Sequence, residues 1–173
     1  MSADASTLDR ELAQPAMDRL LLQFQLDQLN ADYAAALDDK RFDDWPNFFV
    51  EDGSYTVQAR ENFDRGLPLA LMALESQGMM KDRVYGVTQT IFHAPYYTRH
   101  VVSPARLLSV EDGVMHAEAH YAVFRTRPAG VSEVYSVGRY IDEIIKKGDN
   151  LKFRHRLCVY DSEMILNSLI YPI

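Results

Sequence analysis

Three long segments of alternating polarity in the C-terminal half constrain the fold more than any other feature of the sequence. In residues 114–125 the odd positions from 115 to 123 are apolar, while His116, Glu118 and His120 share the other face, the pattern of a strand with one buried face. Residues 133–145 and 151–159 are expected to be two further strands. The turns at 127–130 and 147–150 are short, so the three strands should form an antiparallel meander.

The N-terminal half has a helical pattern instead. Apolar residues between positions 16 and 37 recur mostly at steps of three and four, which predicts a long amphipathic helix. A second, shorter helical segment is expected at 41–50, with Pro46 in its first turn. Next we expect a turn at 51–53, a short strand at 55–59, an irregular segment at 60–69, helical character at 69–87 interrupted near Gly78, and a broken strand at 96–103.

Helices followed by a meander indicate an α+β domain whose N-terminal helices pack on one face of a strongly curved, mainly antiparallel sheet. This order fits a cone-shaped, nuclear-transport-factor-2-like (cystatin-like) fold. Residues 1–15 lack periodicity and are predicted to be an N-terminal arm, either mobile or used in an oligomer contact. Residues 16–173 are the size of a single domain.

Charge and composition exclude several classes of protein. The chain has 18 basic and 25 acidic residues, a formal charge of −7 and no basic stripe, so nucleic acid is not an expected partner. No apolar run approaches the roughly 20 residues that cross a bilayer, and the N-terminus is polar and acidic, so we expect a cytoplasmic protein. The single cysteine, Cys158, excludes an intrachain disulfide and an iron–sulfur cluster held by this chain alone.

Few residue patterns suggest chemistry. His116, Glu118 and His120 share one strand face and could bind zinc or iron, but a solvated face explains the alternation completely. On that interpretation the three residues pair with cationic side chains of a later strand: Lys152, Arg154 and Arg156. The acidic residues near the end of the first helix are expected to be mostly solvated or capping charges: Asp32, Asp38, Asp39, Asp43 and Asp44.

His155 is a separate case, because its parity places it among the apolar residues of its strand. A buried histidine can act as a general base, although a core or subunit-contact histidine is the more common outcome. One interpretation is therefore a free-standing cone-fold enzyme, such as a cyclase, dehydratase or isomerase, with His155, Tyr121 and Tyr33 as its candidates. An open pocket lined by these groups would favour an enzyme, a filled cavity a structural subunit, and an open apolar pocket a binding or adaptor module.

Four short stretches carry a resemblance to a known family. They are WPNFFVEDGSY at 45–55, RENFDRGLPL at 60–69, GMMKDRV at 78–84 and YTRH at 97–100. Together they resemble the beta (small) subunits of bacterial aromatic-ring-hydroxylating dioxygenases, over about residues 20 to 165. The sequence at 60–69 is most similar to that of the branch that acts on salicylate, terephthalate, benzoate and related aromatic acids. The chain departs from the family at Phe92 and His93, where Tyr-Glu is more usual, and in its longer N-terminal arm.

The resemblance implies a division of labour. The large (alpha) subunit of that family carries a Rieske [2Fe-2S] cluster and a mononuclear Fe(II), and the small subunits form a trimer beneath three large ones. An NADH-dependent reductase, often with a ferredoxin, supplies electrons. The small subunit would then hold no cofactor and no catalytic residue, and would stabilise the oligomer. Its contact surface is predicted on residues that combine charge with aromatic area: Asp82, Arg83, Tyr96, Tyr97, Arg99 and His100.

Overall fold

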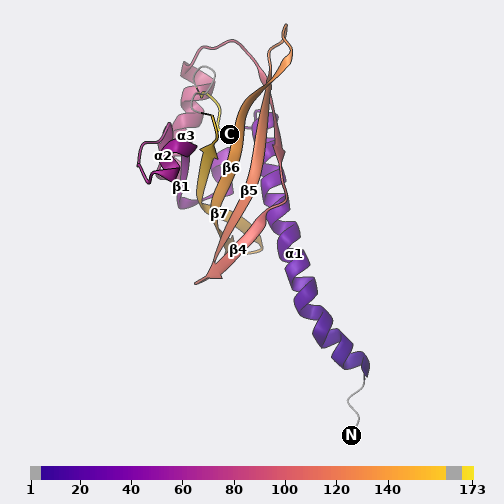
Figure 1. The fold of residues 1–173 in the computed structure, drawn as a ribbon. Helices are drawn as coiled ribbons and strands as arrows, with labels where there is room; N and C mark the ends of the chain where they lie inside the picture. The colour runs from indigo at the N-terminus through magenta and orange to yellow at the C-terminus, as the bar shows by residue number, and fades with distance from the viewer. Residues whose placement is uncertain (1–4, 163–168) are drawn as a thin grey trace.

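A long helix, α1, lies along one side of the sheet and projects beyond its lower end (Figure 1). The computed structural model describes residues 5–162 and 169–173, with side-chain burial from residue 15 on. Helix α1 spans Ala5–Asp38, so it begins well before the predicted start at 16 and includes Pro15. The first part of α1 projects beyond the sheet, where no core imposes an apolar stripe, and this explains why periodicity did not reveal it.

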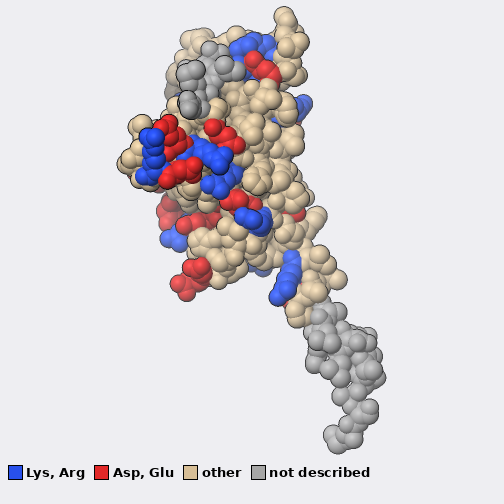
Figure 2. Space-filling model, viewed as in Figure 1, with Lys and Arg blue, Asp and Glu red and all other residues tan. Residues whose placement is uncertain are grey.

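The remaining elements follow in the order of the prediction, with added short ones. They are η1 Trp45–Phe48, β1 Phe49–Ala59, α2 Arg60–Asp64, β2 Met72–Leu74, α3 Gln77–Tyr85, η2 Gly86–Thr90, β3 Tyr97–Val102, β4 Arg106–Glu111, β5 Val114–Thr126, β6 Ser132–Lys147 and β7 Asn150–Tyr160. Figure 2 shows charged side chains gathered around α2, a smaller charged group near the upper end of β5 and β6, and a largely uncharged surface between the two.

The described strands form one sheet in the order β2-β1-β7-β6-β5-β3, with β4 also pairing β5. Strands β5, β6 and β7 pair antiparallel as the predicted meander, while β1 pairs β7 in parallel. Strands β6 and β7 approach closely at Gly138, where a β-carbon would lie 2.0 Å from the carbonyl oxygen of Val159. The predicted α+β fold, with helices packed on a curved and mainly antiparallel sheet, is confirmed.

The segment after α1 differs locally from the prediction. The helical segment expected at 41–50 is only the 3-10 turn η1, with Pro46 at its start. Strand β1 begins at Phe49 because the predicted turn at 51–53 is a bulge within the strand, between the pairs Phe49–Phe153 and Ser54–His155. Gly53 permits this bulge, since a β-carbon there would lie 2.9 Å from the carbonyl oxygen of Val50.

The helical character predicted across 69–87 is only partly correct. Met72–Leu74 forms strand β2 at the edge of the sheet, and α3 begins at Gln77. The start of α3 is fixed by Ser76, whose side chain accepts a hydrogen bond from the N–H of Met79. Gly78 therefore lies in the first turn of α3 and does not interrupt it.

Two further expectations, for the segments 60–69 and 96–103, were wrong, and one strand was not predicted. The segment 60–69 contains the short helix α2, stabilised by an Arg65–Glu61 ion pair of 2.9 Å at i,i+4 spacing. Strand β3 is continuous, with no break. Strand β4, which the sequence analysis did not predict, pairs with the first half of β5.

Aromatic rings fill the space between α1 and the sheet. Tyr33, on α1, contacts Phe153 at a centroid distance of 5.7 Å and Tyr140 at 6.2 Å, both edge to face. Trp45 contacts Tyr55 at 5.1 Å in the same manner. Because edge-to-face pairs are directional, this packing fixes the position of α1 over the sheet as well as burying area.

Candidate functional site

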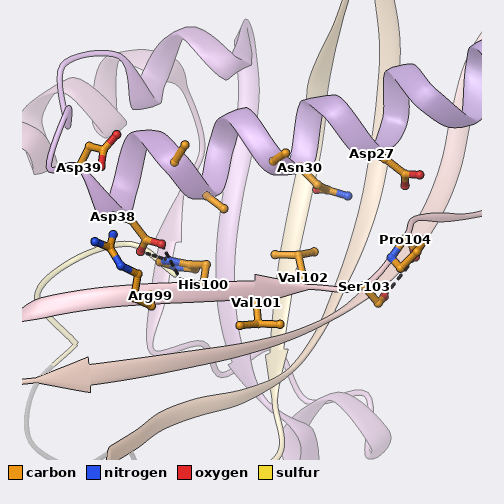
Figure 3. A pocket seen from close by; sticks show the side chains of 13 residues that line it. Asp27, Asn30, Asp38, Asp39, Arg99, His100, Val101, Val102, Ser103 and Pro104 are labelled. Atoms are coloured by element: carbon orange, nitrogen blue, oxygen red, sulfur yellow. Dashed lines mark hydrogen bonds and ion pairs between the residues drawn. The ribbon is translucent and has the colours of Figure 1, made fainter. Parts of the chain in front are cut away.

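A groove of about 650 Å³ lies between α1 and β3, and Figure 3 shows its lining. Two of its polar side chains, Asp38 and His100, are bonded to each other. The ring Nδ1 of His100 lies 2.6 Å from one carboxylate oxygen of Asp38, and the backbone N–H of His100 donates to the other at 2.9 Å. Asp27, further along the groove, accepts a 2.7 Å hydrogen bond from the N–H of Ala105. These contacts fasten α1 to the strands.

An aspartate–histidine pair can act as a general base, but here the geometry opposes that role. The side chain of His100 is 0% exposed and that of Asp38 is 9% exposed. The free ring nitrogen, Nε2, is buried and has no hydrogen-bond partner among the described residues, so a substrate in the groove could not reach it. The pair therefore holds the end of α1 against β3. The sequence analysis expected most acidic residues in this region to be solvated or capping charges. Asp38 is instead largely shielded from solvent.

A bulge in β7 changes which side chains of this strand point into the cone, so the interior differs from the prediction. Ile144 pairs with Phe153 and Glu143 pairs with His155, which leaves Arg154 as the extra residue. One extra residue exchanges the two faces for the rest of the strand. The predicted inward position of His155 and outward position of Arg156 are therefore both wrong.

Arg156 is completely buried in the interior. Its Nε and Nη2 donate to the two carboxylate oxygens of Asp142 at 2.9 and 2.8 Å, and Nη2 also donates to the side-chain oxygen of Asn30 on α1. The side chains of Arg156 and Asp142 are 0% and 1% exposed. A two-point pair of this kind is among the strongest hydrogen-bonded arrangements in proteins.

Aromatic rings surround the guanidinium. Its central carbon lies 3.9 Å from the ring centroid of Phe153, 4.0 Å from that of Tyr140 and 4.3 Å from that of Tyr33. Burial alone would lower the pKa of Arg156, but the charge of Asp142 outweighs burial and raises it. The arginine therefore stays charged and enclosed, which suits a structural role.

The three residues considered for an enzyme are not brought together. Tyr33 and Tyr121 lie inside the cone, where Tyr121 stacks on Tyr140 at 4.5 Å and lies 3.2 Å from the hydroxyl of Ser136. His155 is on the opposite face of the sheet, with its Nδ1 2.7 Å from the hydroxyl of Ser54. Burial raises the pKa of both Tyr33 and Tyr121, so neither phenol ionises near neutral pH.

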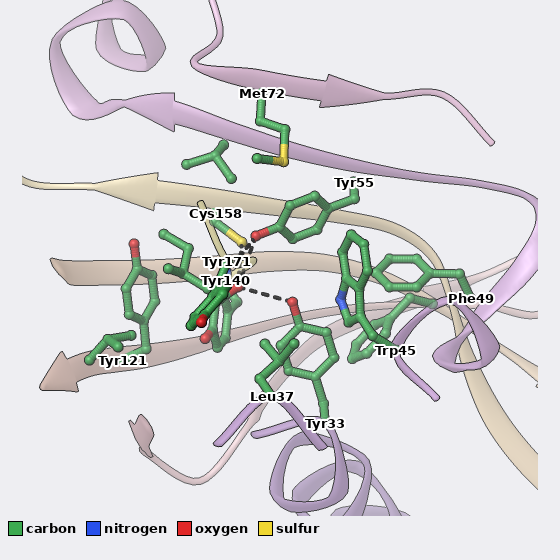
Figure 4. Close-up of a cluster of buried hydrophobic side chains, with 14 of the residues drawn as sticks. Tyr33, Leu37, Trp45, Phe49, Tyr55, Met72, Tyr121, Tyr140, Cys158 and Tyr171 are labelled. Atoms are coloured by element: carbon green, nitrogen blue, oxygen red, sulfur yellow. Dashed lines mark hydrogen bonds between the residues drawn. The ribbon is translucent and has the colours of Figure 1, made fainter. Parts of the chain in front are cut away.

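The C-terminal residues 169–173 pack into the core of the cone, and Figure 4 shows Tyr171 of this segment among the other buried rings. The hydroxyls of Tyr33 and Tyr55 both donate to the carbonyl oxygen of Ile173 at 3.0 Å, and the N–H of Ile173 donates to Tyr55 at 2.9 Å. Tyr171 packs against Tyr96 at a centroid distance of 4.5 Å. Sequence analysis gave no role to this segment.

The thiol of Cys158 belongs to the same cluster. It is completely buried and lies 3.5 Å from the carbonyl oxygen of Ile173. Burial raises the pKa of Cys158 to about 12, so the thiol stays protonated and is neither a nucleophile nor a ready metal ligand.

The predicted contact residues divide into two sets. Arg83 donates to the carbonyl oxygens of Leu169 and Ile170 at 2.8 and 2.7 Å and so holds the C-terminal segment. Tyr96 is buried, and the ring of His100 faces Asp38. The other three of the predicted residues, Asp82, Tyr97 and Arg99, are exposed.

The histidine and glutamate face of β5 is partly exposed, as the solvated interpretation predicts. Glu118 pairs with Arg106 at 3.2 Å and with Arg139 at 3.4 Å, and not with the cationic residues of β7 that the sequence analysis suggested. Within the described ranges, no three side chains of His, Cys, Asp or Glu are grouped so that they could hold a metal ion. No helix within those ranges has the length and hydropathy needed to span a bilayer.

Comparison with known proteins identifies the family. A model of the ring hydroxylating beta subunit family matches residues 33–167. The small subunit of anthranilate 1,2-dioxygenase from Burkholderia cepacia is 31% identical over 150 residues, covering 87% of this chain and 93% of that subunit. Subunit beta 2 of the terminal oxygenase component of terephthalate 1,2-dioxygenase from Comamonas sp. is 26% identical over 154 residues, covering 89% and 100%. The chain therefore belongs to the ring hydroxylating beta subunit family.

A solved structure agrees with this conclusion. A chain from Novosphingobium aromaticivorans, assigned as the beta subunit of an aromatic-ring-hydroxylating dioxygenase, superposes with a TM-score of 0.82 at 37% identity, covering 90% of this chain and 99% of that one. Other solved structures, at 16% and 18% identity, share the cone-shaped fold alone, with TM-scores of 0.66 and 0.65. The predicted nuclear-transport-factor-2-like fold and the family resemblance are both confirmed.

The buried ion pair predicts that two neighbouring acidic residues, Asp142 and Glu143, contribute very differently to the free energy of unfolding. Asp142→Ala should lower the free energy of unfolding by about 3–5 kcal/mol, because it leaves the guanidinium of Arg156 buried without its counter-charge. Glu143→Ala is the matched control, since Glu143 is 38% exposed and only 3.9 Å from Arg154, and it should cost no more than about 1 kcal/mol. Urea unfolding followed by circular dichroism measures both, and equal losses would contradict a structural role for the buried pair.

The Asp38–His100 pair predicts that the stability of the folded state depends on pH. Burial would raise the pKa of Asp38, but the hydrogen bonds from His100 outweigh it and hold the pKa below its ordinary value of 3.8. A lowered pKa stabilises the folded state above the unfolded-state pKa, and this contribution is lost as the pH falls through the folded-state value. The stability difference between the wild type and Asp38→Asn should therefore be widest near pH 7 and shrink below about pH 4. Asp39→Asn, at a side chain 59% exposed, should show no such narrowing in acid-unfolding curves.

Proposed function

We propose that this chain is a non-catalytic small subunit that gives shape and contact area to an aromatic-ring-hydroxylating dioxygenase. The observation that carries the proposal is the filled cone, in which Tyr33 and Tyr55 hydrogen-bond to Ile173 of the C-terminal segment. A cone-fold enzyme needs an open pocket with acid–base groups at its wall. Here the same space is occupied by the chain itself, and this favours the structural subunit over the free-standing enzyme.

The redox chemistry is assigned to a partner. We propose that an iron-bearing large subunit carries a Rieske cluster and a mononuclear iron, since the one cysteine in this sequence falls short of the thiolates that such a cluster needs. An NADH-dependent reductase, with or without a ferredoxin, would deliver electrons to that subunit, and we propose that the complex is cytoplasmic. We further propose three large and three small subunits, with the small subunits forming a trimer.

The relatives suggest the class of substrate. Anthranilate and terephthalate, which appear in the names of two relatives, are both aromatic carboxylic acids. We therefore propose that the complete enzyme hydroxylates the ring of an aromatic acid, bound by the large subunit. The substrate-binding residues would then belong to the large subunit. The small subunit would need no open pocket, in agreement with its filled cone.

Co-purification tests the proposal. A tagged copy of this chain, recovered from its native host, should bring down a larger, iron-containing protein in equal molar amount, with iron measured by mass spectrometry and stoichiometry by quantitative gel staining. The control is the same chain denatured and refolded alone, which should contain no iron. Recovery of the native chain without such a partner, or turnover of an aromatic acid by the chain alone, would contradict the proposed function.

A further inference from the structure

The sheet has an open edge along strand β3, on the side of α1. Strand β3 is the last in the order β2-β1-β7-β6-β5-β3, so among the described strands it pairs only with β5. In an antiparallel pair, backbone groups of alternate residues point toward the partner strand and the others point away. The N–H of Ser103 donates to the carbonyl oxygen of His120 on β5, whereas that of His100 donates to Asp38 of α1. The backbone N–H and C=O of Val102, which has the parity of His100, therefore face away from β5.

Side chains of α1 bond to this edge at two points. At one end, Asp38 accepts a hydrogen bond from the N–H of His100 at 2.9 Å. At the other end, the N–H of Ala105 donates to Asp27 and its carbonyl oxygen accepts from the side chain of Gln23, both at 2.7 Å. We call these two contacts the clamps. They supply the hydrogen bonds that a neighbouring strand would otherwise make.

Between the clamps the edge is bare. The clamps are roughly 16–17 Å apart along both elements, at about 1.5 Å per residue in a helix and about 3.3 Å in an extended chain. Over this length α1 presents the exposed Ala31 and Ala35, which line the groove of about 650 Å³ together with Val102. Figure 3 shows Val102 between Asp38 and Asp27. Within the described ranges, no side chain is hydrogen-bonded to the backbone of Val102.

A bare strand edge is a template for a further strand. An extended peptide along it would form main-chain hydrogen bonds with Val102 and place small side chains on Ala31 and Ala35, where α1 has no larger side chain to block the approach. In this mode of recognition the backbone bonds give affinity and the shallow side-chain sites give specificity. The length between the clamps suits about five extended residues.

The charge of the groove indicates a basic partner. Three carboxylates, those of Asp27, Asp38 and Asp39, and one guanidinium, that of Arg99, line the groove. Asp39 is 59% exposed and lies 3.9 Å from Arg41, a distance at which an exposed ion pair is weak. A second copy of this chain, with a formal charge of −7, is a poor electrostatic match for such a groove. A basic segment of a different protein fits it better.

We propose that an extended, basic segment of the iron-bearing large subunit binds in this groove and adds a strand to the edge of β3. Its backbone pairs with the outward N–H and C=O of Val102, and a lysine or arginine of the segment approaches Asp39. The inference deepens the proposed function, because it names the surface and the mode by which the small subunit binds its partner, and it rests on that function.

Co-purification of the tagged full-length chain from its native host tests the groove. Ala35→Trp should lower recovery of the large subunit at least about tenfold, because the indole would occupy the place of the added strand. Gln28→Trp is the matched control, since Gln28 is exposed on the same helix but lines a different hollow, and recovery should stay within about twofold of the wild type. Thermal unfolding curves verify that both variants fold.

A charge reversal tests the chemistry of the partner. Asp39→Lys should lower recovery of the large subunit about three- to tenfold, because it repels a basic segment. Asp32→Lys makes the same change at an exposed residue of α1 that does not line the groove, and it should have no such effect. Equal losses in the two variants, or no loss in either, would overturn the inference.

Hydrogen exchange distinguishes strand addition from a contact of side chains alone. The N–H of Val102 should exchange at least about tenfold more slowly in the native complex than in the purified full-length chain. The N–H of Val101, which points toward β5, is the internal control and should exchange slowly in both. Mass spectrometry with electron-transfer fragmentation resolves the two amides. An unchanged rate at Val102 would overturn the inference.

The failure of the inference is distinguishable from the failure of the proposed function. If the wild type and Ala35→Trp recover the large iron protein equally, the proposed function stands and the inference is overturned. If the wild type recovers no such protein, both are contradicted. If Ala35→Trp retains the large subunit but changes the sedimentation of the chain alone, the groove belongs to a second copy and the inference is overturned.

Discussion

The ion pair between Arg156 and Asp142, buried inside the cone, is the interaction on which the rest of the structure depends. Two charges removed from water destabilise a protein unless they are paired and fully hydrogen-bonded. Arg156 is paired with Asp142 from the neighbouring strand and also bonds Asn30 of α1, which is 126 positions away in the sequence, while its Nη1 has no hydrogen-bond partner among the described residues. The pair thus requires β6, β7 and α1 to be in their final positions at once.

The aromatic packing and the C-terminal segment complete what the ion pair begins. Tyr33 contacts the guanidinium through its ring and Ile173 through its hydroxyl, so one side chain links the charged centre to the segment that fills the cone. Arg83 holds that segment from α3. In other proteins the cone scaffold can surround a pocket. In this chain the protein's own side chains occupy that space, so its outer surfaces are the parts that can contact other molecules.

The meander could be predicted from sequence because alternation reports directly which face of a strand is buried. The bulge at Arg154 could not, since an inserted residue changes the pairing without leaving a mark in the composition, and parity then assigns His155 and Arg156 to the wrong faces. The predicted contact surface stays a prediction, and only three of its six residues are exposed, for a related reason. Tyr97 and Arg99 are exposed as expected, but charged and aromatic neighbours such as Tyr96 and His100 alternate inward on or beside the same strand. The family itself was identifiable because four short stretches match together, and they lie in different elements: 45–55 covers η1 and the start of β1, 60–69 covers α2 and the turn after it, 78–84 is part of α3 and 97–100 is part of β3.

The central claim is that this chain supplies structure and no catalytic group. The most direct test is the turnover of the assembled oxygenase, expressed per iron, when the interior phenols are replaced one at a time by phenylalanine in Tyr33→Phe, Tyr55→Phe and Tyr121→Phe. If the claim holds, complexes that assemble will turn over at the wild-type rate within about twofold, well short of the 10²-fold or greater loss typical of removing a general acid or base. A hundredfold loss in a complex with full assembly and full iron content would contradict it.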